Sequence, residues 1–184
     1  MAPDLYHGGR TLGCVVSVVR DAARGAGPTF DELDAVRRHL VESPVCTGAV
    51  GVMGFCLGGG FAVLLAQSGC YRAASVNYGS LPRDPGRVLR TACPVVASYG
   101  ARDRTLRDVG PRLAAALSAN GVSHDVKTYP DAGHGFLNDH GDDDVPWFVE
   151  LLAWASNTAY DESAAADARQ RIVDFFRAHI GSTG

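Results

Sequence analysis

One segment constrains the fold more than any other: a short apolar run that passes directly into a glycine-rich turn and then into a helix. Residues 49–55, AVGVMGF, are almost wholly apolar and lack the alternation of a half-exposed strand. That pattern is typical of a strand buried on both faces, as in a parallel sheet. Residues 57–67 follow with helical character. Because parallel strands need crossover connections, this strand-then-helix unit predicts a sheet covered by helices.

The same order recurs along the rest of the chain. We predict further strands at Ala73–Tyr78, Pro94–Tyr99 and His124–Tyr129, and helices at Val109–Asn120 and Glu162–His179, the last ended by Gly181. Strands that alternate with helices indicate an α/β protein with a mostly parallel sheet and helices on both faces. In such sheets the chemistry lies at the carboxyl ends of the strands. No repeat or low-complexity linker divides the chain, so we expect one domain over residues 1–184.

Before the first predicted strand, residues 13–23 (GCVVSVVRDAA) favour a helix, although their β-branched content leaves a strand open. The segment Thr29-Phe30-Asp31-Glu32 matches a capping box. In that motif the Thr29 side chain would accept from the Glu32 amide and the Glu32 side chain would reach back. We therefore expect a second helix, FDELDAVRRHLVE, to begin at Phe30 after the Thr29 cap and to end before Pro44.

Composition excludes several classes of protein. A formal net charge of -3, without any Lys/Arg run, disfavours nucleic acid as a partner. No stretch approaches the roughly 18 apolar residues of a membrane span, and MAPDLYHGGR does not have the order of a signal peptide. The five cysteines form no CxxC pair, which argues against a disulfide framework or zinc and for a reducing, cytoplasmic setting. The acidic stretch 139–144 does not match a calcium loop, so we expect no metal.

The turn after the first predicted strand carries the chemistry. Gly54-Phe55-Cys56-Leu57-Gly58-Gly59 fits the pattern G-x-nucleophile-x-G of a nucleophile elbow, with cysteine as the nucleophile. A nucleophile on so tight a turn has a strained backbone, and we expect Gly54 and Gly58 to remove Cβ atoms that would collide there. The helix start would lower the pKa of the thiol, and the Leu57 amide would form part of an oxyanion hole.

The pattern alone also fits a glycine-rich turn with a buried cysteine. A dinucleotide site fits less well, because these glycines do not follow G-x-G-x-x-G. Two further residues favour the nucleophile: Asp103 follows the strand PVVASY, and His134 lies between glycines after the strand HDVKTY. The order nucleophile, acid, histidine is that of a hydrolase triad. His134 would take the proton of Cys56, and Asp103 would fix the tautomer of the histidine. Alone, each would be an ordinary loop residue.

These segments together resemble the dienelactone hydrolase (carboxymethylenebutenolidase) family. The matching pieces are APDLY at 2–6, GVMGFCLGGG at 51–60, VNYG at 76–79, CPVVASYGARD at 93–103, YPDAGHGF at 129–136 and YDESAAADARQRIVDFFRAHI at 160–180. The resemblance implies an α/β-hydrolase fold and hydrolysis of a small ester or enol-lactone through a cysteine acyl-enzyme. It implies no metal or organic cofactor. Cys56, Asp103 and His134 match the positions of the family's catalytic triad.

The chain departs from the family in two places. In the family the APDLY segment lies well inside the chain, so we expect this sequence to lack the first strands. The second oxyanion amide and the glutamate that this part of the family supplies would then be missing too. A complete minimal enzyme is the alternative. Second, Leu137 and Asn138 follow the GHGF segment where the dienelactone enzymes have an arginine for the substrate carboxylate; Arg10 is our candidate for a substrate-binding arginine. The competing functions are a non-catalytic binding or dimerising fragment and an acyl transferase.

Overall fold

The computed structural model describes residues 1–5, 12–139 and 160–181. The chain forms two compact units, Met1–Val50 and Gly51–Gly184. The first contains two helices, α1 (Leu12–Arg24) and α2 (Pro28–Val41), which contact each other. Residues 13–23 are therefore helical, and the strand alternative is wrong. Between the two helices, Gly25 and Gly27 have φ values of 68° and 137°, which only glycine adopts without strain.

The predicted capping box is wrong. Helix α2 begins one residue before Thr29, with Pro28 in its first turn and Gly27 as its N-cap. Thr29 is buried, and its hydroxyl donates to the Asp21 carboxylate of α1 at 2.7 Å, while its amide donates to the same oxygen at 3.1 Å. A carboxylate eight residues upstream thus takes the place of the local side-chain cap, and it ties the two helices together.

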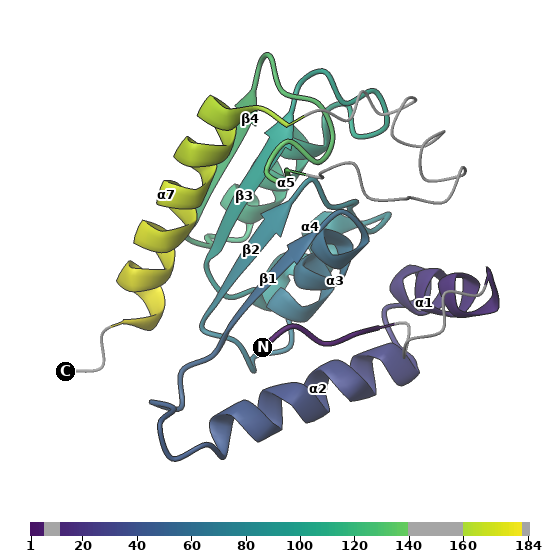
Figure 1. Cartoon of the computed structure of the whole chain (residues 1–184), viewed down its shortest axis with the longest axis vertical. Coiled ribbons are helices and arrows are strands. Elements are labelled where there is room, and N and C mark those ends of the chain that lie inside the picture. The colour runs from purple at the N-terminus through teal and green to yellow at the C-terminus, as the bar shows by residue number, and fades with distance from the viewer. Residues whose placement is uncertain (6–11, 140–159, 182–184) are drawn as a thin grey trace. The chain divides into compact units, whose positions relative to one another are not determined.

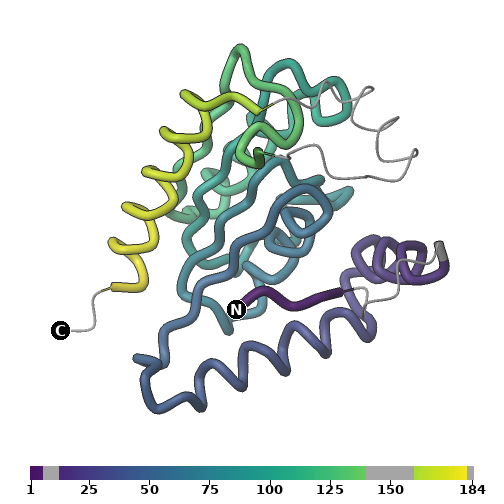
Figure 2. The backbone as a smooth tube through the Cα atoms, viewed as in Figure 1, coloured from purple at the N-terminus to yellow at the C-terminus, as the bar shows by residue number. Residues whose placement is uncertain are grey.

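The second unit is built on a parallel sheet (Figure 1). Its strands are β1 (Gly51–Phe55), β2 (Ala73–Asn77), β3 (Val95–Gly100) and β4 (His124–Tyr129), in the order β1-β2-β3-β4. All three pairings are parallel, as the alternation of strands and helices predicts. The expectation that β1 is buried on both faces is wrong: β1 is the last strand of the described sheet, and Met53 is 51% exposed. The tube in Figure 2 returns to the same end of the sheet after each strand. The four carboxyl ends consequently lie along one edge, which we call the rim.

Helices cover both faces of this sheet. On one face lie α3 (Leu57–Ala66) and α5 (Val109–Ala119), with the short α4 (Pro85–Val88) and the 3-10 turn η1 (Leu89–Thr91). On the other lies α7 (Glu162–Ile180). A separate apolar core fills each side: Val76, Val95 and Leu113 belong to the first, and Tyr78, Val96 and Ile172 to the second. The predicted α/β class with two covered faces is confirmed.

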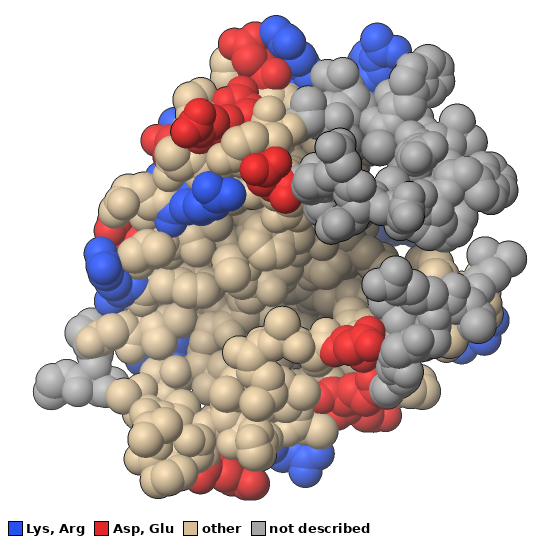
Figure 3. Space-filling model, viewed as in Figure 1, with Lys and Arg blue, Asp and Glu red and all other residues tan. Residues whose placement is uncertain are grey.

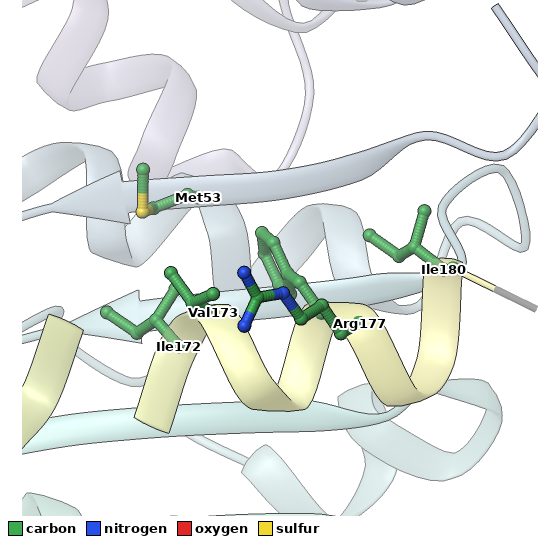
Figure 4. Close-up of a pocket in the computed structure, with 7 residues that line it drawn as sticks. Met53, Ile172, Val173, Arg177 and Ile180 are labelled. Carbon is green, nitrogen blue, oxygen red and sulfur yellow. The ribbon is translucent and has the colours of Figure 1, made fainter. Parts of the chain in front are cut away.

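Helix α7 is held differently along its two sides. Toward β4, the half-buried Arg171 donates to the Asp125 carboxylate at 2.9 Å and to the Asp125 carbonyl at 3.0 Å. Its guanidinium also reaches the Tyr129 hydroxyl at 3.2 Å. Toward β1, an apolar groove of about 480 Å³ separates Met53 from α7 (Figure 4). The rest of its lining comes from the helix and the residue that follows it: Ile172, Val173, Phe176, Arg177, Ile180 and Gly181.

Charges of both signs are mixed on the α7 side of the molecule (Figure 3). Lys127 pairs there with Asp167 at 2.7 Å, and Arg177 lies 3.5 Å from Asp174. Such mixing does not create the one-sign surface that a polyanion would need. Among the residues that the structure describes, no helix is both long enough and apolar enough to span a bilayer.

Candidate active site

The predicted site residues come from three strand ends at the rim. Cys56 directly follows β1, Asp103 lies in the loop after β3, and His134 lies in the loop after β4. Parallel register brings these ends together, since Phe55 pairs with Asn77 and Asn77 with Ser98. Three residues that are far apart in sequence therefore occupy one edge of the sheet.

Cys56 occupies a strained turn between β1 and α3. Its φ and ψ are 53° and -119°, a conformation that costs a residue with a side chain on the order of 1–3 kcal/mol. Two backbone hydrogen bonds hold it: its amide donates to the Asn77 carbonyl at 3.0 Å, and its carbonyl accepts from the Gly60 amide at 3.2 Å. The side chain is exposed and stands at the N-cap of α3. The turn thus presents a thiol at the positive end of a helix.

Glycines make this turn possible, although not both of the expected ones. A Cβ on Gly54 would overlap the backbone of Gly58, so Gly54 is required as predicted. A Cβ on Gly58 would meet nothing within 4 Å, and the collision expected at Gly58 is therefore wrong. The close approach falls on Gly59, whose Cβ would come within 2.8 Å of the Asn77 carbonyl oxygen and of Gly79. Helix α3 packs so tightly against the end of β2 that only glycine fits.

Asp103 is fully buried, and every contact holds its carboxylate in one orientation. One oxygen lies 2.6 Å from His134 Nδ1. The other accepts from the Thr105 amide at 2.8 Å and from the Thr105 hydroxyl at 2.6 Å. Burial acts to raise the pKa of Asp103, but the hydrogen bonds from His134 and Thr105 outweigh it and leave this pKa below its usual value. The carboxylate is therefore ionised beside the imidazole.

His134 lies between this carboxylate and the thiol, with its side chain 17% exposed. Its loop is locked to the loop after β3, since the Arg102 amide donates to the Ala132 carbonyl at 3.0 Å. Burial opposes protonation of the ring, but hydrogen bonds to Asp103 and Cys56 outweigh it and raise the pKa of His134 to about 9. Because Nδ1 faces Asp103, the other ring nitrogen is the one that serves the thiol.

The thiol of Cys56 responds to the same contact. A hydrogen bond from His134 lowers the pKa of Cys56 most, against the opposing effect of burial, and the positive imidazole lowers it further. A hydrogen bond from the Leu57 backbone amide acts in the same direction. The structure therefore brings Cys56, Asp103 and His134 together at the rim. His134 and the Leu57 amide both lower the pKa of Cys56, so the arrangement favours a thiolate beside an imidazolium.

Two contributors were not predicted from the sequence. Thr105 fixes Asp103, and the spacing Asp-x-Thr is a recognisable turn in which an aspartate accepts from the backbone two residues on. Tyr78 packs on His134 with ring centroids 5.0 Å apart. Its only sequence signal is an aromatic residue directly after a buried strand, which is too common to identify a site.

Two predictions fall outside the described residues: Arg10 as a substrate-binding residue and the acidic stretch 140–144. Within the described part of the chain, no cluster of His, Cys, Asp or Glu has the arrangement of a metal site. All five cysteines are free thiols, and Cys70 is exposed like Cys56.

Comparison with known proteins gives a consistent result. The family model for the dienelactone hydrolase family matches residues 1–180. A carboxymethylenebutenolidase from Pseudomonas putida is 30% identical over 146 residues, which cover 78% of this chain and 55% of the relative. One from Rhodococcus opacus is 24% identical over 191 residues, 97% of this chain and 69% of the relative. The chain spans about half the length of the first relatives it matches, 50% and 55%.

Solved structures agree on the fold. A Klebsiella pneumoniae protein assigned as a dienelactone hydrolase superimposes with a TM-score of 0.63 at 26% identity, over 80% of this chain and 60% of that one. Esterase 2 of Thermogutta terrifontis superimposes with a TM-score of 0.60 at 19% identity, over 95% of this chain and 67% of that one. The second likeness supports the α/β-hydrolase fold alone.

Proposed function

Because the chain belongs to the dienelactone hydrolase family, we propose that it hydrolyses a small ester or enol-lactone with Cys56 as nucleophile, His134 as base and Asp103 as orienting acid. The observation that carries this proposal is the 2.6 Å contact between His134 Nδ1 and Asp103, made by a histidine that lowers the pKa of the Cys56 thiol on its strained turn. A nucleophile, a base within reach and a group that orients the base form the arrangement that covalent catalysis requires.

The first half of the reaction forms an acyl-enzyme. The Cys56 thiolate attacks the acyl carbon of the ester, and the carbonyl electrons move to oxygen to give a tetrahedral oxyanion. The Leu57 amide, which also lowers the pKa of Cys56, stabilises this developing negative charge. The intermediate collapses when the bond to the leaving oxygen breaks, and His134 donates its proton to that oxygen. A thioester on Cys56 remains.

The second half returns the enzyme to its starting state. Neutral His134 removes a proton from water as the water oxygen attacks the thioester carbon. The new tetrahedral intermediate expels the Cys56 sulfur as a thiolate and releases a carboxylic acid, which ionises. Throughout, Asp103 keeps Nδ1 protonated and stabilises the imidazolium when it forms. The cycle uses these three side chains, the backbone amide of Leu57 and water.

The substrate class follows from the relatives. Two of them are carboxymethylenebutenolidases, whose name describes hydrolysis of an unsaturated lactone. We propose a substrate of comparable size, an ester or lactone with a good leaving oxygen. We also place the protein in the cytoplasm, because a nucleophilic cysteine has to stay reduced and all five cysteines are free.

Turnover of p-nitrophenyl acetate tests the proposal. We expect the chain to release p-nitrophenol over many turnovers, and Cys56→Ala to reduce the rate to the buffer background. Cys70→Ala is the matched control, because it removes another exposed thiol and should leave the rate unchanged. Intact-mass measurement after a short reaction should show one acetyl group on Cys56.

Each competing function gives a different result. Alkylation of Cys56 without any ester turnover would reject catalysis and favour a binding or dimerising role. If added methanol or a small thiol diverts most of the acyl group to a new ester or thioester, the protein is an acyl transferase rather than a hydrolase. Equal rates for the protein with and without Cys56 would reject the assignment of the nucleophile.

A further inference from the structure

Resting on the proposed function, we infer that Tyr78 is a positioning residue: its ring holds the imidazole of His134 in line with Cys56 and favours the protonated imidazole that the thiolate requires. The observation behind this is a ring contact at 5.0 Å between centroids, tilted by 58°. Asp103 fixes one nitrogen of His134, and Tyr78 packs against the ring itself. A hydrogen bond to one atom leaves the imidazole free to tilt about that bond, so the aromatic neighbour supplies the second restraint.

The backbone of Tyr78 is strained, and this strain is next to that of Cys56. Tyr78 has a φ of 39°, and Cys56 has a φ of 53°. Phe55 pairs with Asn77 in the sheet, so the two strained residues directly follow neighbouring strand ends. A left-handed aromatic residue is a rare outlier that persists only where its surroundings enforce it, and such outliers cluster at functional sites.

The surroundings enforce it through the backbone. The Tyr78 amide donates to the Ser98 carbonyl at 2.8 Å. The next residue, Gly79, lies against Gly59 of α3 so closely that a Cβ would overlap its backbone, and the Gly79 carbonyl accepts from the Tyr99 hydroxyl at 3.0 Å. The side chain therefore has no freedom to leave the rim, and its ring is 1% exposed.

The ring also links the nucleophile to the histidine. Tyr78 lies 6.1 Å from the ring of Phe55, the residue before Cys56, and 5.9 Å from the ring of Phe136, two residues after His134. Its own position is thus set by both sides of the site. Its hydroxyl is buried and finds no hydrogen-bond partner within the described residues. The contact between Tyr78 and His134 that the structure shows is therefore the contact of their rings.

The energetic reason is the charge on the imidazolium. A cation within about 6 Å of an aromatic centroid is attracted by the negative face of the ring, and more strongly in a buried site. When His134 is protonated, Tyr78 is at that distance. Removing the ring removes both the packing restraint on the imidazole and this attraction. The pKa of His134 then falls, and a smaller fraction of Cys56 is present as the thiolate.

The test measures the thiolate without requiring turnover. We expect Tyr78→Phe to alkylate with iodoacetamide at Cys56 as fast as the unmodified protein at pH 6.5. Tyr78→Met, which keeps an apolar side chain but not the ring, should slow alkylation by roughly three- to thirtyfold. Phe175→Leu is the matched control: it removes a ring from the same apolar core, at a position that stacks on His179 rather than on Tyr78 or His134, and should change the rate less than twofold.

The outcomes are separable. A Phe variant as slow as the Met variant would assign the effect to the hydroxyl and overturn the inference. So would a control as slow as Tyr78→Met, because the effect would then be general loosening. If Tyr78→Met does not fold, a second experiment replaces Tyr78 with a ring-fluorinated phenylalanine, and NMR measures the pKa of His134. A pKa lower than in Tyr78→Phe supports the inference, and an equal pKa overturns it. Unreactive Cys56 in the unmodified protein would instead reject the proposed function.

Discussion

Two neighbouring residues of β1 lie in opposite surroundings. Gly54 is buried, and one added carbon there would overlap the backbone of Gly58. Met53, one residue earlier, is 51% exposed and borders the open groove beside α7. Two residues past Gly54, two backbone hydrogen bonds hold a strained cysteine. The rim is therefore tightly specified, while the groove at the flank of the same strand is loosely packed.

The difference shows where this sequence concentrates its constraints. At the rim, glycine, strain and buried polar groups coincide, so each residue type is fixed by several neighbours at once. In the groove the contacts are apolar and few, and many side chains would serve. Substitutions at the two places should consequently differ by several kcal/mol in their cost to the free energy of unfolding.

Gly54→Ala should have the largest effect. Its methyl group meets backbone rather than a movable side chain, so we expect a loss of more than about 4 kcal/mol of unfolding free energy, or no soluble protein. Urea denaturation followed by circular dichroism measures this loss. Gly58→Ala is the control: its Cβ has open space, and alanine should leave stability unchanged or raise it by up to about 1 kcal/mol. The reverse order would show that the turn is packed differently.

Asp103→Asn should have the next largest effect. The amide keeps the shape of the side chain but removes the negative charge that helps to raise the pKa of His134 to about 9. We expect the rate of ester hydrolysis to fall by roughly 10²- to 10⁴-fold. Asp131→Asn is the matched control, because that aspartate pairs with Arg102 at 2.5 Å on the surface of the same two loops. Equal losses in both variants would mean that the loops, rather than the charge beside His134, limit the reaction.

The thiols themselves give the third comparison. Contact with His134 lowers the pKa of Cys56, whereas burial raises the pKa of Cys93 to about 11. At pH 7 only about one Cys93 in 10⁴ is ionised, so mass spectrometry should find Cys56 alkylated more than about 100-fold faster. Raising the pH to 10 should strongly accelerate the alkylation of Cys93 and change that of Cys56 little. Lowering the pH through the pKa of Cys56 should slow the alkylation of Cys56. Parallel pH profiles would contradict the assigned thiolate.

Much of this rim could be predicted from the sequence, because the order of strands and loops along the chain determines which residues lie there. A parallel strand leads into each loop at the same edge, so Cys56, Asp103 and His134 could be placed there without knowing any distance. Residues whose importance depends on contact between separate strands could not be found this way. Gly59 matters because the end of β2 passes over it, and Tyr78 because the loop after β4 lies against it.

The failed capping box has the same explanation. Thr29 and Glu32 have the right spacing for a local motif, but the Asp21 carboxylate of the preceding helix takes the Thr29 hydroxyl and amide instead. Similarly, Val173 has the spacing of a buried residue in α7 yet is 43% exposed, because it borders the groove. Local pattern describes what a segment can do, and its neighbours in space decide which option is used.

The fourth prediction compares the two sides of α7. Arg171 makes several hydrogen bonds on the β4 side with its side chain only 14% exposed, so Arg171→Met should cost about 2–3 kcal/mol of unfolding free energy. Arg177 borders the groove and pairs with Asp174 only at 3.5 Å, with both side chains exposed, so Arg177→Met should cost less than about 0.5 kcal/mol. Urea titration of both variants measures the contrast, which similar losses would refute.

Met53→Gln should have the smallest effect. Met53 of β1 lies across the groove from Val173 and Arg177 of α7 (Figure 4), and glutamine has nearly the same length and flexibility as methionine. Because half of Met53 is already exposed, we expect a change of less than about 0.5 kcal/mol in unfolding free energy and no change in ester hydrolysis. A loss above about 1.5 kcal/mol would mean that the groove closes around Met53 in solution. The loosely packed flank would then be a second core of β1, and its contrast with the rim would disappear.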